Sequence, residues 1–167
     1  MIVLCDSSPL ITLSKIGRLE LLHELYGKIT ITPEVYSEVV LRSTHLAGAA
    51  ELPKSAWIQV YSLKKQKDLD AMRQRFGIGA GEASVIQLGQ EIGADILLMD
   101  DRKARNSARG LGLAVLGCVG ILQDGFRSKR APDLSQAYRE LAVSGAYVDR
   151  ALLENILKIL KLPPLSG

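Results

Sequence analysis

Ile2-Val-Leu-Cys-Asp6 decides the fold together with a second stretch, Ile96-Leu-Leu-Met-Asp-Asp101. Each is a short apolar run of the kind that forms a buried strand, and in each the apolar residues are followed directly by an aspartate. A strand has no structural need for a carboxylate immediately beyond it. If the two strands are parallel neighbours, both acids lie at the same edge of the sheet, where the carboxyl ends of strands form the ligand crevice of α/β folds. These stretches therefore predict a parallel sheet with an acidic site at one edge.

The rest of the chain continues the alternation of strand and helix. Short apolar runs predict further strands at 28–32 and 113–116, and we expect a short edge strand at 57–61. Helical periodicity fills the gaps between these runs. Such alternation predicts an α/β fold with three α/β/α layers, a central, mostly parallel sheet and right-handed crossovers.

Capping residues and glycines mark the expected helix ends. Ser8-Pro9 predicts the start of the first helix, and Thr32-Pro33 predicts the start of the third, with Thr32 as N-cap. Glycines at 77–81 separate a polar helical stretch at 64–76 from a helix at 82–91. We expect one domain over residues 1–167, whose last helices, at about 133–162, pack on the core or on a partner.

Composition and charge are those of an ordinary globular protein. The chain is 47% hydrophobic and 23% charged. Its two cysteines lack metal-ligand spacing, so we expect reduced thiols and a cytoplasmic location. No apolar run approaches the length of about 20 residues that spans a bilayer, so no membrane association is expected. The net charge of +3 does not by itself indicate nucleic acid, but bases gather in short runs, one of them at 102–109 directly after the acidic pair.

Five carboxylates are the candidate catalytic and metal-ligating residues: Asp6, Glu38, Glu82, Asp100 and Asp101. Each also has a structural explanation. Asp6 can cap the first helix, although Ser8 offers another cap there, Glu38 can be an ordinary surface glutamate, and Glu82 suits a helix N-terminus. In a regular strand Asp100 and Asp101 point in opposite directions, so we expect Asp100 to be a ligand and Asp101 to cap the next helix or to bind through water. Taken together, the acids follow one another along the chain in the order in which successive βα units would bring them to the same edge of the sheet. This combination supports a shared site more strongly than any one acid does.

A cluster of carboxylate oxygens, with no histidine or cysteine expected nearby, favours Mg²⁺ or Mn²⁺ over zinc. Such a cluster holds one or two ions, and a pair about 3.5–4 Å apart can activate water and stabilise the leaving oxygen in phosphodiester cleavage. Arg102 and Arg105 follow the acidic pair on one helix, so we expect them, with Ser8, to hold substrate phosphate. Arg109 continues the spacing, but a solvated role is equally open for it.

These residues resemble a PIN domain, and the whole chain resembles the PIN-like subfamily related to VapC toxins. The similarity runs through Asp6-Ser-Ser-Pro-Leu-Ile11, Pro33-Glu-Val-Tyr-Ser-Glu38, Gly81-Glu82 and Leu97-Leu-Met-Asp-Asp-Arg-Lys-Ala-Arg105. The resemblance implies a Mg²⁺- or Mn²⁺-dependent endoribonuclease for single-stranded RNA, with Asp6, Glu38, Glu82 and Asp100 as acidic ligands. It also implies a homodimer and, in many members, a cognate antitoxin. Many PIN nucleases carry a further acid a few residues beyond the one corresponding to Asp100, where this chain has bases. This departure leaves two alternatives open: Asp101 substitutes for that acid, or catalysis is weak.

Other functions fit less well. A receiver-like domain needs an acidic pair after the first strand and a lone phosphoacceptor after a middle one, the reverse of the order here. The glycines at 77–81 follow a polar helix and lack the Gly-Lys-Ser/Thr ending of a P-loop, and His23-Glu24 lacks the second histidine of a zinc protease. One alternative stays open: a PIN-like module that keeps the acidic pocket but acts by binding RNA or a protein, with weak catalysis.

Overall fold

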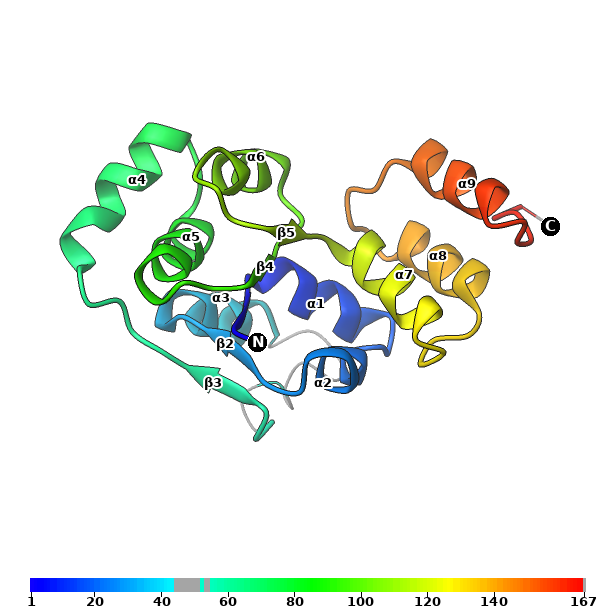
Figure 1. The fold of residues 1–167 in the computed structure, drawn as a ribbon, viewed down its shortest axis with the longest axis horizontal. Coiled ribbons are helices and arrows are strands. Elements are labelled where there is room, and N and C mark those ends of the chain that lie inside the picture. Colours follow the sequence, from blue (N-terminus) through cyan, green and yellow to red (C-terminus); the bar gives the residue numbers. More distant parts are fainter. Residues whose placement is uncertain (44–51, 53–54, 167) are drawn as a thin grey trace.

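The computed structural model describes residues 1–43, 52 and 55–166, and its strands form a single five-stranded sheet (Figure 1). The strands are β1 Val3–Cys5, β2 Ile29–Ile31, β3 Ile58–Val60, β4 Ile96–Leu98 and β5 Val115–Leu116. Their spatial order is β3-β2-β1-β4-β5, so β1 lies at the centre and β3 forms an edge, as expected. Every pairing is parallel, which confirms the predicted sheet.

The register of β1 and β4 brings their carboxyl ends to the same edge of the sheet. Cys5 pairs with Leu98, and the Asp6 N–H donates to the Leu98 carbonyl oxygen at 2.9 Å. Asp6 therefore leaves the sheet directly beside the chain that leads to Asp100. The expected meeting of two acidic strand ends is confirmed.

Helices cover both faces of the sheet. In chain order they are α1 Ser7–Lys15, α2 Glu20–Tyr26, α3 Pro33–Ser43, the 3₁₀ turn η2 Gln66–Asp68, α4 Leu69–Phe76, α5 Ala80–Ile92, α6 Arg102–Gly110, α7 Cys118–Arg127, α8 Leu134–Val143 and α9 Arg150–Ile159. Figure 1 shows α1, α2 and α7 on one side of the strands and α5 and α6 on the other, with α8 and α9 beyond α7. This is the three-layer α/β/α arrangement that the alternating pattern predicts.

Most helix ends follow the expected signals, but α5 begins at Ala80, inside the glycine stretch that was expected to precede a helix at 82–91. The Thr32 hydroxyl accepts the Val35 N–H at 3.2 Å, as expected of an N-cap, and Gly77 ends α4 with φ 63°, in the left-handed region that suits glycine. The start of α1 also differs, because this helix begins at Ser7 with Asp6 in the N-cap position. Ser8 is therefore not the cap, because it already lies inside the first turn.

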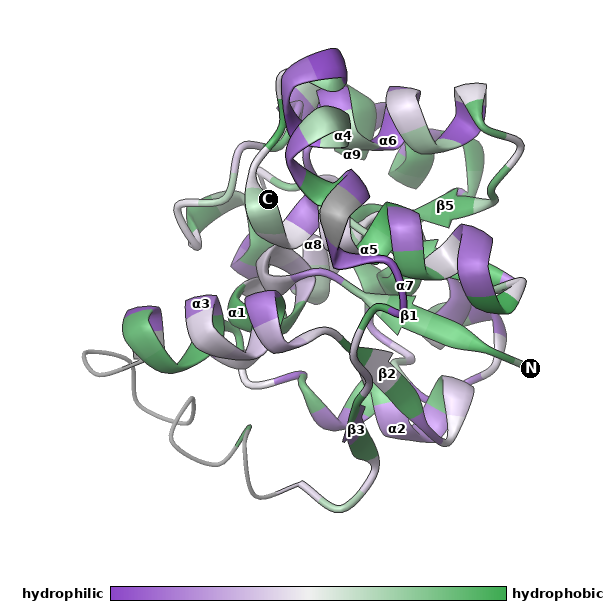
Figure 2. Ribbon diagram, turned by 90° about the vertical axis from the view of Figure 1, so that its left-hand side faces the viewer, coloured by the Kyte–Doolittle hydropathy of each residue, from purple (hydrophilic) through white to green (hydrophobic). Residues whose placement is uncertain are grey.

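The core lies between the sheet and its covering helices. Val3, Leu4 and Cys5 of β1 are at most 1% exposed, and Figure 2 shows β1 and β5 in the green of hydrophobic residues. Tyr138 of α8 and Leu153 of α9 are also fully buried. Apolar runs of this kind are expected of parallel strands that are covered on both faces. Over the described ranges, no helix has the length and apolar character needed to cross a bilayer.

Candidate functional site

Asp6 is a buried acid at the carboxyl edge of the sheet. It is 1% exposed, and none of the described residues donates a hydrogen bond to its Oδ1 atom. Burial raises the pKa of Asp6 to about 7; the negative charges of Glu82, Glu38 and Asp100 add to the increase, and a backbone hydrogen bond from Ser7 opposes it. A buried carboxylate that has an unpaired oxygen and acidic neighbours is stabilised by a cation.

Glu38 reaches the same edge from α3, and two other helices hold it. The Ser7 hydroxyl of α1 donates to its Oε2 at 2.6 Å, and the Gly81 N–H of α5 donates to its Oε1 at 3.1 Å. A Cβ on Gly81 would lie 2.6 Å from Oε1, so any other residue there would displace the Glu38 carboxylate from its present position. The interpretation of Glu38 as an ordinary surface glutamate is wrong, because its half-buried carboxylate joins three helices.

Glu82 lies in the first turn of α5, where it also has a structural task. Its Oε2 accepts the Gly79 N–H at 2.7 Å, which satisfies a backbone donor at the helix start. Burial raises the pKa of Glu82, and the charges of Asp101 and Glu38 raise it further, while the Gly79 hydrogen bond and the Arg42 guanidinium lower it. Glu82 therefore both caps its helix and contributes negative charge to the acidic edge.

Asp100 lies two residues beyond β4, and the N-terminus of α7 holds it. Cys118, the first residue of α7, donates its N–H to Oδ1 at 2.7 Å and its thiol to Oδ2 at 3.0 Å. A Cβ on Gly117 would lie 2.9 Å from Oδ1, so this position also favours glycine. The expectation that no cysteine lies near the acids is therefore wrong.

Asp101 caps the helix that follows the acidic pair. Its Oδ1 accepts the Ala104 N–H at 2.8 Å, which confirms its expected role as the N-cap of α6. The residue is exposed, and its charge still acts on Glu82. Asp101 thus lies at the margin of the acidic edge, and its role as a ligand remains a prediction.

The basic residues of α6 differ in how closely they approach the acids. Arg105 is half-buried, and its Nε finds no hydrogen-bond partner among the described residues. Its Nη1 lies 3.1 Å from the point where a Gly117 Cβ would stand, and Asp100 Oδ1 lies 2.9 Å from that same point. Arg102 and Arg109 are exposed, and Ser8 is half-buried in α1. Of the candidate phosphate ligands, Arg105 is therefore the one placed beside Asp100.

Four different elements bring together Asp6, Glu38, Glu82 and Asp100, which we call the acidic cluster. The last three all act electrostatically on Asp6. In the described part of the chain, no three acid, histidine or cysteine side chains already converge as metal ligands do. Glu38, Glu82 and Asp100 instead accept protein hydrogen bonds, whereas Asp6 Oδ1 accepts none from the described residues. A divalent cation fits this set chemically, because its donors are carboxylate oxygens and one of them is buried without compensation.

Two buried hydroxyl groups fix α3 against α5 beside Glu38; the sequence indicated Thr32 only as a helix cap, and it did not indicate Ser84. The Thr32 and Ser84 hydroxyl oxygens lie 2.7 Å apart, and the Ser84 hydroxyl donates to the Gly81 carbonyl oxygen at 2.7 Å. Thr32 and Ser84 are both fully buried and lie 52 positions apart in the chain. The contact between Thr32 and Ser84, like those made by the Ser7 and Cys118 side chains, has no local sequence signal, because its partners come from different elements.

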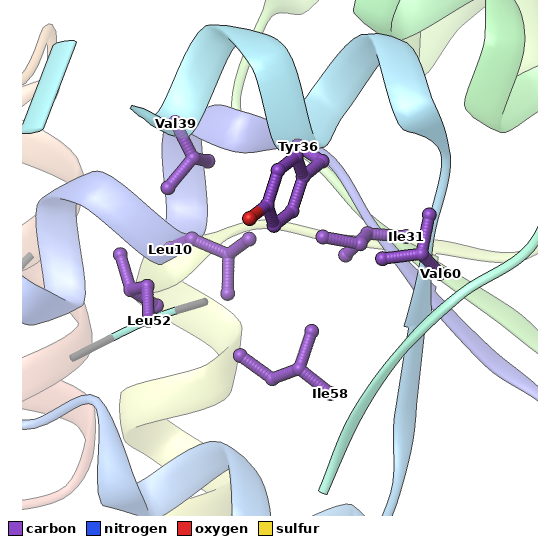
Figure 3. Close-up of a pocket in the computed structure, with 7 residues that line it drawn as sticks. All are labelled: Leu10, Ile31, Tyr36, Val39, Leu52, Ile58 and Val60. Atoms are coloured by element: carbon purple, nitrogen blue, oxygen red, sulfur yellow. The ribbon is translucent and has the colours of Figure 1, made fainter. Parts of the chain in front are cut away.

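An apolar pocket between α1, α3 and β3 is separate from the acidic cluster (Figure 3). Leu10, Val39 and Ile58 line it, and the ring of Tyr36 covers one side. None of the five candidate acids belongs to its lining. The charged groups of the acidic edge therefore do not gather at this apolar pocket.

Comparison with known proteins gives one result that covers nearly the whole chain. A family model described as a PIN domain matches residues 2–162. No curated protein matches the sequence.

Proposed function

The chain belongs to the PIN-domain family, and from this membership and the acidic cluster we propose that the protein is an endoribonuclease that depends on Mg²⁺ or Mn²⁺. PIN domains are generally nucleases, so the fold is of a nuclease type. Single-stranded RNA as substrate and metal-activated water as nucleophile are the specific parts of the proposal. The observation that carries it is the buried Asp6, whose Oδ1 lacks a donor among the described residues and whose neighbours are acids.

The acidic cluster would hold the cation through carboxylate oxygens of Asp6, Glu38, Glu82 and Asp100, with Asp101 contributing through water. Oxygen ligands suit Mg²⁺ and Mn²⁺. When bound, such an ion supplies a water nucleophile at neutral pH and Lewis-acid stabilisation of the phosphoryl oxygens. Hydrogen bonds from Ser7 and Gly81 orient Glu38, and those from Cys118 orient Asp100. These contacts hold the carboxylates in place without using all of their lone pairs.

Arg105 and Arg102 would bind phosphates of the RNA that flank the cleaved bond. Arg105 lies beside Asp100, so its guanidinium is placed to give a phosphate oxygen a charge-assisted hydrogen bond next to the acidic cluster. Arg102 is exposed at the start of α6 and would add a further phosphate contact. Ser8, in the first turn of α1, would donate its hydroxyl to the same backbone. Phosphate contacts of this kind bind without reading the base sequence.

Cleavage of a panel of single-stranded RNAs tests the proposal. Purified protein is assayed with Mn²⁺, Mg²⁺ or EDTA beside the variants Asp6→Asn and Asp100→Asn. Each variant removes a charged ligand at nearly constant volume, so we expect activity to fall on the order of 100-fold or more while circular dichroism stays unchanged. The matched control is Glu24→Gln, an exposed carboxylate of α2, which should cleave like the wild type. Full activity in EDTA, or in either folded aspartate variant, would defeat the assignment.

A second function has a specific observation in its favour. Several acids already accept protein hydrogen bonds, and no three potential ligands converge within the described residues, as expected of a module that binds RNA or a protein without strong catalysis. Binding of RNA without cleavage under any metal condition would favour this alternative. Cleavage that is lost in Asp6→Asn would exclude it.

The remaining expectations stay predictions from the sequence. They are a single domain over residues 1–167, a homodimer, a VapC-like toxin role with a cognate antitoxin, and a cytoplasmic location. A toxin role predicts that expression of the wild-type chain halts growth and that Asp6→Asn restores it. The molar mass of the purified protein in solution tests the homodimer.

A further inference from the structure

Cys118 makes two hydrogen bonds to a single carboxylate. Its backbone N–H donates to Asp100 Oδ1 at 2.7 Å, and its thiol donates to Oδ2 at 3.0 Å. Both oxygens of Asp100 are therefore fixed by one residue, and that residue comes from a different βα unit. Each oxygen retains a lone pair, because a carboxylate accepts about four hydrogen bonds or ligands in total.

We propose that Cys118 is a positioning residue, whose thiol sets the rotation of the Asp100 carboxylate so that its remaining lone pairs face the cation of the acidic cluster. The role rests on the proposed metal-dependent function. Groups that hydrogen-bond a metal ligand typically change metal affinity or activity by 10- to 100-fold when they are removed. Neither the family match nor the sequence pattern assigns a role to this cysteine.

The two hydrogen bonds differ in what the side chain contributes. Any residue except proline at position 118 keeps the N–H that binds Oδ1, and the N-terminus of α7 favours a negative charge there. Only the side chain supplies the donor for Oδ2. Removing the thiol therefore frees one oxygen while the other stays held, so the carboxylate can rotate without leaving the site.

The surroundings leave little room for another arrangement. Cys118 is 2% exposed, and a Cβ on Gly117 would stand within 3.1 Å of both Asp100 Oδ1 and Arg105 Nη1. Asp100 and Arg105 therefore both lie close to the backbone at 117, and the next residue, Cys118, is buried with its thiol on Asp100. A buried cysteine usually packs as a small apolar residue. The Cys118 thiol differs because it also donates a hydrogen bond to a carboxylate oxygen.

Cys5 provides a matched control. It is also fully buried and lies at the same edge of the sheet, but its thiol donates to the backbone carbonyl oxygen of Asp6 at 3.3 Å. Replacing Cys5 by alanine removes a buried sulfur of the same size without removing a donor to a carboxylate. A loss of packing alone should therefore affect both cysteine positions in the same way.

The test measures Mn²⁺ binding directly by electron paramagnetic resonance, for the wild type, Cys118→Ala, Cys118→Ser, Cys5→Ala and Asp100→Asn. We expect Cys118→Ala to bind Mn²⁺ about tenfold more weakly. Cys118→Ser, which keeps an O–H donor, should restore most of the affinity, and Cys5→Ala should match the wild type. In cleavage assays, Cys118→Ala should need about tenfold more Mn²⁺ for half-maximal rate, with little change in the rate at saturating Mn²⁺.

The outcomes separate this role from the proposed function. Wild-type affinity in Cys118→Ala, beside lost affinity in Asp100→Asn, would overturn the positioning role and leave the metal site standing. Equal losses in Cys118→Ala and Cys5→Ala, or no recovery in Cys118→Ser, would overturn it as well. A wild-type protein that binds no Mn²⁺ would overturn the metal proposal together with the positioning role.

Discussion

Asp6 and Asp100 follow neighbouring parallel strands at one edge of the sheet, yet their environments are opposite. Asp6 occupies the N-cap position of α1, but its Oδ1 receives no hydrogen bond from the described residues and it is 1% exposed. Asp100 accepts hydrogen bonds on both oxygens from Cys118, at the start of α7. The comparison shows that a strand end supplies the carboxylate, while the donors that reach its oxygens from another element determine whether its charge is compensated.

The largest expected effect is on the pH dependence of stability, and it comes from Asp6, the carboxylate whose charge is not compensated. A carboxyl whose pKa rises from 3.8 to about 7 on folding binds more protons in the folded state between those values. The free energy of unfolding therefore falls as pH rises through that window, by up to roughly 4 kcal/mol. Urea denaturation in EDTA at several values between pH 4 and pH 8 measures this slope.

The same slope should shrink in Asp6→Asn, because the amide does not titrate. Glu82, whose pKa is also raised, accounts for a remaining slope of the same sign. A wild-type stability that rises from pH 5 to pH 8, or an unchanged slope in Asp6→Asn, would contradict the assignment of this effect to Asp6.

Replacing each aspartate by asparagine should change stability in opposite directions at pH 8. Asp6→Asn removes a buried charge that lacks a donor at Oδ1, so we expect the free energy of unfolding to rise by about 1–3 kcal/mol. Asp100→Asn keeps one oxygen that can accept from Cys118 but sets its amide NH₂ against the other Cys118 donor, so we expect a decrease of about 1–3 kcal/mol. Urea denaturation of both variants in EDTA checks the signs. If both variants changed the free energy of unfolding in the same direction, the contrast between the environments of Asp6 and Asp100 would be wrong.

Glycine-to-alanine changes test how closely the backbone packs against the carboxylates of Glu38 and Asp100. The added Cβ would lie 2.6 Å from Glu38 Oε1 in Gly81→Ala and 2.9 Å from Asp100 Oδ1 in Gly117→Ala. We expect each to reduce the free energy of unfolding by about 1–3 kcal/mol, with the larger loss at Gly81. Gly110→Ala is the control, because nothing beyond its chain neighbours and its own helix backbone lies within 4 Å of the added Cβ. A loss at Gly110 as large as that at Gly81 would contradict the steric explanation.

The smallest expected effect concerns RNA binding on the Asp100 side. Arg105→Gln should weaken binding of single-stranded RNA a few-fold and reduce its salt slope by about 1, because one phosphate contact is lost. Arg109→Gln should have a weaker effect, since Arg109 is exposed near the end of α6. Fluorescence anisotropy in EDTA over a salt series measures both. Equal effects of the two variants would indicate a diffuse basic helix in place of a defined contact beside Asp100.

Much of the fold was predictable, because its elements depend on local patterns. Apolar runs and capping residues located the strands and most helix starts, and Asp101 was correctly assigned as the cap of α6. The start of α1 was misjudged at Ser8, because Ser7 and Ser8 offer equivalent local caps. Neither of them caps α1 with its side chain, and the Ser7 hydroxyl bonds Glu38, 31 positions away.

The candidate acids could be predicted individually, but their environments could not. The edge shared by Asp6 and Asp100 follows from the pairing of β1 with β4, which the alternating pattern anticipates. The donors that hold Glu38 and Asp100 come from other elements. A sequence pattern that repeats every two or four residues carries no information about such contacts.

The order of residues alone was sufficient for the class of fold, the approximate helices and strands, and a set of acids at strand and helix ends, because hydrophobic periodicity and caps act over a few positions. Folding decided which of these acids are compensated. Packing left Asp6 Oδ1 without a donor among the described residues, and it set the Cys118 thiol against Asp100. Burial and hydrogen bonding depend on elements that are distant in the chain, and these two quantities set the charge and orientation of each carboxylate.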